Sequence, residues 1–187
     1  MQSLSQMSAT KHVFITPRDD DAADFIEEQC ASLGISDTRV VEYDFDVSGQ
    51  AECVMIATPH LQADKELLIF SLEAAAEPGG IKPELFYGDG HILCVSQFGK
   101  DMLNSSRVDA EMLNQNRLSE YDTTSAYFYF KSASLYEQLY YENYSNTKDN
   151  ATMQRNIIPL YDRLLHSGGV VHHTTLQPGR VLALAKL

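Results

Sequence analysis

Apolar and polar residues alternate with different periods along the first half of the chain. The segment 12–16, apolar at its centre and closed by Pro17, predicts a short buried strand. Strict alternation of apolar and acidic residues over 41–46 predicts a second, half-exposed strand, and an apolar run at 53–57 predicts a third. Because only a short turn separates the last two, we expect them to pair antiparallel.

Two other segments of the first half have helical periodicity. Acidic residues at 19–24 lie at the start of a helix whose apolar side runs through 22–33 and which ends at Gly34. Residues 63–77 are apolar nearly all round, which predicts a buried helix. A further strand is expected at 92–95. The resulting order, βαββαβ, matches the ferredoxin-like motif.

The second half has a weaker pattern of apolar positions. They predict a helix, an aromatic strand, two helices and a closing hairpin, over 108–118, 126–130, 135–144, 159–166 and 170–184. We therefore expect a single α+β domain over 1–187 with a mixed or antiparallel sheet, in which the half at 99–187 packs on the half at 11–98. A three-layer α/β arrangement is the alternative.

The net charge of −12 belongs to the first half of the chain. Residues 1–98 contain seventeen acidic and five basic side chains, whereas residues 99–187 contain nine of each. A pI near 4.8 argues against direct binding to a nucleic-acid backbone, which needs clustered Lys and Arg. No apolar run approaches the length of about eighteen residues that spans a membrane, and the first residues lack the pattern of a signal peptide. We expect a cytoplasmic protein without a membrane partner.

Two groups of carboxylates are candidates for chemistry. Asp19, Asp20 and Asp21 follow a predicted strand, where carboxylates can help to hold Mg²⁺, but residues on one turn need a second element to complete a site. The alternative is a solvated first turn of a helix. Asp89 and His91 stand at a strand entrance, as an acid–base pair or as ordinary turn residues between glycines.

A histidine-rich string near the C-terminus is the third candidate. On a strand, His173 and Thr175 point to one face. The residues at 173–176 resemble the His-x-Thr-apolar element of the 2H phosphoesterases, whose sites need two such elements. The other candidate element, at 12–15, lacks the threonine, and an exposed strand is the alternative interpretation. No zinc, P-loop or dinucleotide motif occurs, so the sequence predicts no cofactor and no metal.

Tyrosine is concentrated in the neutral half, which holds eight of the ten tyrosines of a chain without tryptophan. Tyr136, Tyr140 and Tyr144 recur four apart on one face of the predicted helix, with Tyr141 beside them. Tyrosine rings on one helical face indicate either buried core or a protein interface. Their polar neighbours leave little apolar breadth, and we assign all four residues to an interface.

Two functional hypotheses follow from the sequence. The preferred one is a non-catalytic, acidic protein-interaction or assembly module that self-associates or docks a protein partner, as a structural subunit of a larger complex or particle would. The alternative is a small enzyme acting on a phosphorylated or nucleotide-like small molecule. Its candidate catalytic residues are Asp19, Asp20, Asp21, Asp89, His91 and His173. The enzyme hypothesis requires several of these residues to converge in one pocket.

Overall fold

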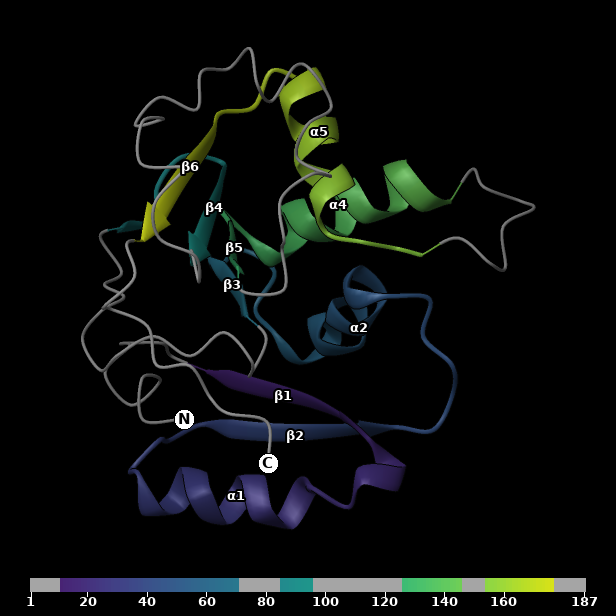
Figure 1. Cartoon of the computed structure of the whole chain (residues 1–187), viewed down its shortest axis with the longest axis vertical. Coiled ribbons are helices and arrows are strands. Elements are labelled where there is room, and N and C mark those ends of the chain that lie inside the picture. The colour runs from purple at the N-terminus through teal and green to yellow at the C-terminus, as the bar shows by residue number, and fades with distance from the viewer. Residues whose placement is uncertain (1–10, 71–84, 96–125, 146–153, 177–187) are drawn as a thin grey trace.

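The structure is a computed structural model, shown in Figure 1. It describes four stretches of the chain, residues 11–70, 85–95, 126–145 and 154–176. The helix predicted at 108–118, the end of the helix predicted at 63–77 and the last strand of the predicted hairpin lie outside the described residues.

The first unit of the fold is a strand–helix–strand crossover. It contains β1 (His12–Pro17), the short 3-10 helix η1 (Arg18–Asp20), α1 (Ala23–Ser32) and β2 (Thr38–Tyr43). The two strands pair in parallel, which is the pairing that a helical connection allows. Phe14 of β1 packs against Ile26 and Cys30 of α1 in a small core. The predicted strand and helix at the start of the chain are therefore confirmed.

The second unit is built on a four-stranded mixed sheet. Its strands are β3 (Leu67–Phe70), β4 (Gly90–Val95), β5 (Ala126–Phe130) and β6 (Val171–Leu176). They lie in the order β3-β5-β4-β6, with β5 antiparallel to both neighbours and β4 parallel to β6. Three strands therefore run in one direction and β5 in the other. The predicted α+β class with a mixed sheet is confirmed.

Helices cover one face of this sheet, as Figure 1 shows for α4 and α5. The helical elements of the second unit are α2 (Gln50–Ala57), η2 (Thr58–His60), α4 (Ala133–Tyr144) and α5 (Ile158–His166). The Ser132 hydroxyl caps α4 by accepting a hydrogen bond from the amide of Leu135 at 3.1 Å. No helix among the described residues is long and apolar enough to cross a membrane.

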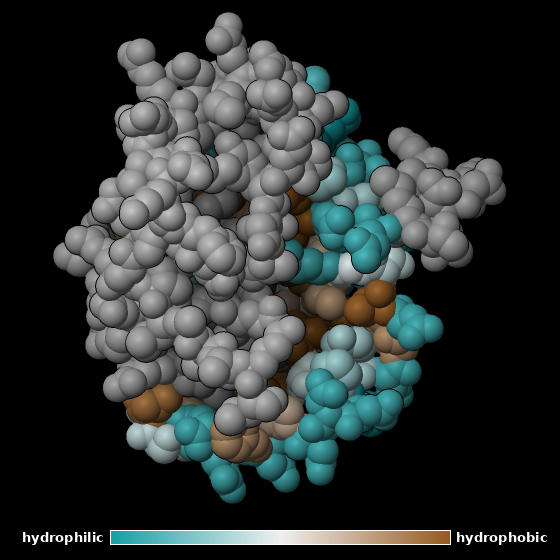
Figure 2. All heavy atoms as spheres, viewed as in Figure 1, coloured by the Kyte–Doolittle hydropathy of each residue, from teal (hydrophilic) through white to brown (hydrophobic). Residues whose placement is uncertain are grey.

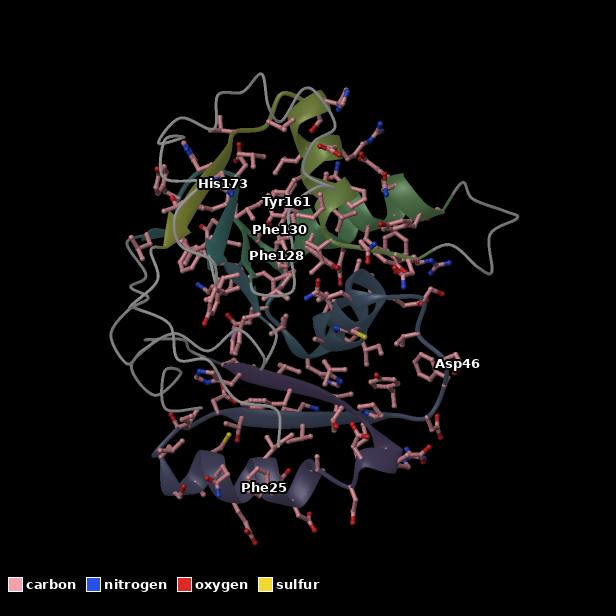
Figure 3. The ribbon with its side chains drawn as sticks, viewed as in Figure 1. Phe25, Asp46, Phe128, Phe130, Tyr161 and His173 are labelled. Carbon is pink, nitrogen blue, oxygen red and sulfur yellow. The ribbon has the colours of Figure 1, made fainter. Side chains whose placement is uncertain are left out.

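The main core lies between the sheet and helices α4 and α5. Phe128, Phe130 and Tyr161 group together there, as Figure 3 shows. The rings of Phe130 and Tyr161 stack with centroids 4.6 Å apart. A Cβ at Gly90 would lie 2.8 Å from the Tyr161 ring, so the strand reaches this ring only because residue 90 has no side chain.

Two predicted elements of the first half have the wrong type. Residues 53–57, predicted as a strand, belong to helix α2, whose buried Ala51, Val54 and Ala57 lie three residues apart on one face. Residues 67–70, predicted as a helix, form strand β3. The ferredoxin-like βαββαβ order is therefore not found, and β2 pairs in parallel with β1 instead of antiparallel with 53–57. Apolar runs this short fit a buried strand and a buried helix equally well.

Candidate functional site

The candidate site lies on the face of the four-stranded sheet that points away from α4 and α5. Residues paired across neighbouring strands share a face, so the strand register places them side by side. Two rows of side chains cross this face: Leu68, Tyr129, His91 and His172, then Phe70, Tyr127, Leu93 and Thr174. The opposite face contributes Ile69, Ile92 and Phe128 to the main core. We call the first surface the polar-aromatic face.

His91 is the most deeply buried polar residue of this face, with 0% of its surface exposed. Its Nε2 lies 2.9 Å from the hydroxyl oxygen of Thr174, a hydrogen-bond distance. Its Nδ1 is also buried and has no hydrogen-bond partner among the described residues. Burial, followed by the neighbouring His172 and His173, lowers the pKa of His91 to about 4. The imidazole is therefore neutral at pH 7, and one of its ring nitrogens is left unbonded by the residues that the structure describes.

Two aromatic rings from the segment before β4 pack edge-on against His91. The ring centroid of Phe86 lies 5.8 Å from that of His91, and the centroid of Tyr87 lies 5.1 Å from it. Phe86 also stacks on Tyr129 with centroids 5.7 Å apart, and Tyr87 lies 4.1 Å from His172. Because 52% of Tyr87 is exposed, this aromatic cluster reaches the protein surface.

Tyr129 gives the polar-aromatic face a hydrogen bond to a carboxylate. Its hydroxyl donates a hydrogen bond of 2.8 Å to Oε1 of Glu66, the residue directly before β3. Burial, followed by this bond to Glu66, raises the pKa of Tyr129 to about 12. The hydroxyl therefore stays protonated at neutral pH, and its donor direction is set by Glu66.

Asp89 stabilises the turn that leads into β4 through two hydrogen bonds. Its Oδ2 accepts a hydrogen bond from the amide of Val170 at 3.0 Å, and its Oδ1 accepts one from Nζ of Lys131 at 3.2 Å. The bond from Val170 and then the bond from Lys131 lower the pKa of Asp89. The two residues predicted as an acid–base pair thus have different partners: Asp89 bonds Val170 and Lys131, whereas His91 bonds Thr174.

The other predicted catalytic residues do not share the sheet face of His91. Asp19 and Asp20 form part of η1 and Asp21 follows it, all three exposed, in the first unit. Among the described residues, no three His, Cys, Asp or Glu side chains gather closely enough to hold a metal ion. His173, labelled in Figure 3, pairs with Ile92 and so lies on the sheet face opposite His91. Burial lowers its pKa. The structure therefore does not bring the six candidates together.

Most of the predicted tyrosine interface lies inside the chain. Tyr136, Tyr140 and Tyr144 are buried, whereas 56% of Tyr141 is exposed. The Tyr136 hydroxyl donates to the carbonyl of Ala51 at 2.8 Å, and the Tyr144 hydroxyl donates to a carbonyl in the segment before α5. Tyrosine hydroxyls that reach backbone carbonyls are compatible with a core. Of these four residues, only Tyr141 is placed where a partner can reach it, and its interface role stays a prediction.

Several residues of the polar-aromatic face were not identified from the sequence. They are Glu66, Phe86, Tyr87, Tyr129 and Thr174. The alternation of tyrosine and phenylalanine over 127–130 is a signal for Tyr129, because it places both tyrosines of that strand on one side. The others come together only through the pairing of strands that are far apart in the sequence.

Comparison with known proteins gives a fold but no family. No protein-family model matches the chain, and no curated protein matches it. The fold is similar to that of the nucleoside-diphosphate-sugar pyrophosphorylase from Vibrio cholerae RC9, with a TM-score of 0.71 and 18% identity over 97% of this chain and 80% of that chain. It is also similar to the inositol-1-phosphate CTP transferase from T. maritima, with a TM-score of 0.52 and 11% identity over 88% of this chain and 66% of that chain. At these identities the likeness establishes a shared fold.

Proposed function

We propose that this protein is an enzyme that binds a phosphorylated or nucleotide-like small molecule. The fold likeness supports this class, since the names of both structural neighbours refer to such compounds and one likeness covers 97% of the chain. A shared fold can host many activities, so the proposal must rest on a site in this chain. The proposal takes up the enzyme hypothesis in place of the non-catalytic module preferred from the sequence.

The observation that carries the proposal is the buried Nδ1 of His91, which has no hydrogen-bond partner in the described part of the chain. A buried polar atom without a hydrogen bond costs about 1–3 kcal/mol, and a ligand that bonds it removes this cost. The rings of Phe86 and Tyr87 pack against the His91 ring, and aromatic rings of this kind offer apolar surface to a sugar ring or stacking surface to a base. The site thus has a polar ring nitrogen next to aromatic side chains.

The charge states of the site indicate binding and orientation. His91 is neutral at pH 7 and suits an uncharged hydroxyl or amide group of the ligand. The Tyr129 hydroxyl donates its proton in a hydrogen bond to the carboxylate of Glu66. Their pKa values lie far from neutral pH in both cases, so neither group is suited to acid–base catalysis at pH 7. We assign them to holding the ring of the ligand, apart from the reacting phosphate.

Calorimetric titration of the purified protein tests this proposal. The probes are UTP with glucose 1-phosphate and CTP with inositol 1-phosphate, each with Mg²⁺, and pyrophosphate release is the second readout. His91→Gln and Tyr129→Phe each remove one hydrogen-bonding group, so we expect affinity for the bound probe to fall about 5- to 30-fold. The control is Tyr141→Phe, on the exposed side of α4. The proposal fails if no probe binds, or if His91→Gln binds as tightly as the unmodified protein.

A second candidate function, protein interaction, is favoured by the surface of the first unit. All ten acidic residues between 11 and 46 are exposed. The rings of Phe25 and Phe45 are 60% and 55% exposed. Hydrophilic side chains dominate the lower part of the molecule in Figure 2, where Figure 1 places α1. Light scattering at two salt concentrations tests for self-association, and a monomer under both conditions contradicts the self-associating form of this function.

A further inference from the structure

Three basic side chains in the first described stretch, residues 11–70, form no ion pair with a described acidic residue. The other Lys and Arg residues of the described stretches each form an ion pair: Arg18 with Asp44, Lys131 with Asp89, Arg155 with Glu52 and Arg163 with Glu142. Lys11, Arg39 and Lys65 form no ion pair with any described residue, although acidic residues outnumber basic ones more than two to one there. Because these three side chains form no ion pair with the described acidic residues, they are candidates for binding an anionic ligand.

One pocket and the pairing of β1 with β2 bring these three residues to the same part of the fold. Lys11 and Lys65 line one pocket of about 140 Å³. Its other described lining residues are Asp37, Leu61, Gln62, Glu66 and Ala133. Arg39 and Lys11 both act on His60, whose pKa is lowered first by burial and then by these two cations. The cations come from β2 and from the residues preceding β1 and β3, so only the tertiary structure gathers them.

The pocket lining also holds two carboxylates, Asp37 and Glu66, beside the two lysines. The carboxylate of Glu66 already accepts the hydroxyl proton of Tyr129 in a hydrogen bond. The amides of Ala133 and Ser134, at the start of α4, donate to the carbonyls of Lys65 and Ala63 at 2.9 Å each. These amides at the helix terminus are therefore bonded within the protein, and Lys11 and Lys65 are the basic residues among the described lining. Gln62 and Asp37 add hydrogen-bonding groups suited to hydroxyls.

We propose that this pocket binds the phosphate group of a small phosphorylated compound between Lys11 and Lys65. Lysine ammonium groups are common phosphate ligands, and charge-assisted hydrogen bonds are about twice as strong as neutral ones. The pocket volume of about 140 Å³ equals the share of about five liquid waters at about 30 Å³ each. It holds a phosphate and part of the organic group attached to it.

The position of the pocket separates it from the expected reaction centre. Lys11, Asp37 and Glu66 directly precede β1, β2 and β3, so the pocket lies at the amino ends of these strands. In open sheets with parallel strands, the principal ligand lies outside the carboxyl ends. The pocket is therefore a separate candidate site that shares Glu66 with the polar-aromatic face, and its binding of phosphate does not depend on the proposed function of that face.

The test is a calorimetric titration with inorganic phosphate and, separately, with glucose 1-phosphate and glucose. The variant Lys11→Gln/Lys65→Gln removes both ammonium groups from exposed positions. The matched control, Arg18→Gln/Arg163→Gln, removes the same charge from two exposed sites outside the pocket lining. We expect phosphate affinity to fall at least about tenfold in the lysine variant and to stay unchanged in the control. We also expect His91→Gln to keep phosphate binding.

Each outcome of this titration decides the proposal. Weaker binding of both phosphate compounds in the lysine variant alone supports it, and tighter binding of glucose 1-phosphate than of inorganic phosphate identifies an organic phosphate as the ligand. Absence of phosphate binding to the unmodified protein overturns it, as does equal binding in the lysine variant. Backbone amide shifts of Gln62 and Lys65 during phosphate titration of the unmodified protein give the same decision without any variant. Failure of the nucleotide titrations while phosphate still binds contradicts only the proposed function.

Discussion

Acidification is expected to weaken the fold through His91. The pKa of this imidazole falls from 6.5, its ordinary value, to about 4 in the folded chain, because burial and then His172 and His173 disfavour the charged form. Between these two pH values the unfolded chain binds a proton that the folded chain does not. The free energy of unfolding therefore keeps the full contribution of His91 above pH 6.5 and loses it as the pH falls from 6.5 toward 4.

The size of this effect follows from the shift in pKa. A shift of about 2.5 pH units at about 1.4 kcal/mol per unit corresponds to about 3 kcal/mol as an upper limit. His91 has 0% of its surface exposed, so solvent screening reduces this value little. Small domains have a free energy of unfolding of about 5–15 kcal/mol, so the loss is a large fraction of the total.

Urea unfolding followed by circular dichroism measures the effect. The variant His91→Gln removes the titrating group and keeps an amide able to bond Thr174. The difference in free energy of unfolding between the two proteins should shrink by up to about 3 kcal/mol between about pH 7.5 and about pH 4.5. The pKa values of His12, His60 and His173 are also lowered, but both proteins share these groups.

A difference that stays constant across this pH range refutes the reasoning. If the variant does not fold, titration of the His91 ring by NMR in the unmodified protein gives the same test. An apparent pKa near 6.5 for His91 contradicts the assigned burial, and a value well below it confirms the mechanism.

Other predictions concern packing and are checked by urea unfolding at neutral pH. Gly49→Ala should cost at least about 2 kcal/mol more than Gly34→Ala, since both glycines have positive φ but only at Gly49 would a Cβ meet backbone, with an oxygen 2.7 Å away; equal costs would contradict this contact. Tyr161→Phe should cost about 1–2 kcal/mol, because its hydroxyl proton is shared between two backbone carbonyls of the sheet within hydrogen-bond distance; an unchanged midpoint would show that this hydrogen bonding contributes nothing. Tyr136→Ala should cost about 3–5 kcal/mol, whereas the exposed Tyr141→Ala should stay within about 0.5 kcal/mol; similar values for both would contradict the burial of Tyr136.

The pattern of apolar residues located most elements, and failed where the apolar runs were short. The apolar side of α1, the aromatic run of β5 and the helical spacing of α4 are local signals that predicted the right element. Of the acidic residues predicted to open α1, only Asp24 lies in its first turn, whereas Asp19 and Asp20 belong to η1. The runs at 53–57 and 67–70 carry no periodicity that separates a buried strand from a buried helix. Their types depend on which surface buries them, and that surface comes from residues far away in the chain.

The candidate site shows the same division. His91 was identified from its place at a strand entrance, but its partner Thr174 lies 83 residues away and is brought to it by the parallel pairing of β4 and β6. The tyrosine row of α4 was read correctly as one helical face, yet its burial depends on α2 and on the segment before α5.

Local periodicity, caps and charge are properties of neighbouring residues, so they can be read from the chain: the acidic first half, the α+β class and the tyrosine face of α4 are of this kind. Burial, strand register and the gathering of unpaired charges involve contacts between distant residues. For this reason the lowered pKa of His91, the burial of Tyr136 and the shared pocket of Lys11 and Lys65 all depend on the folded structure.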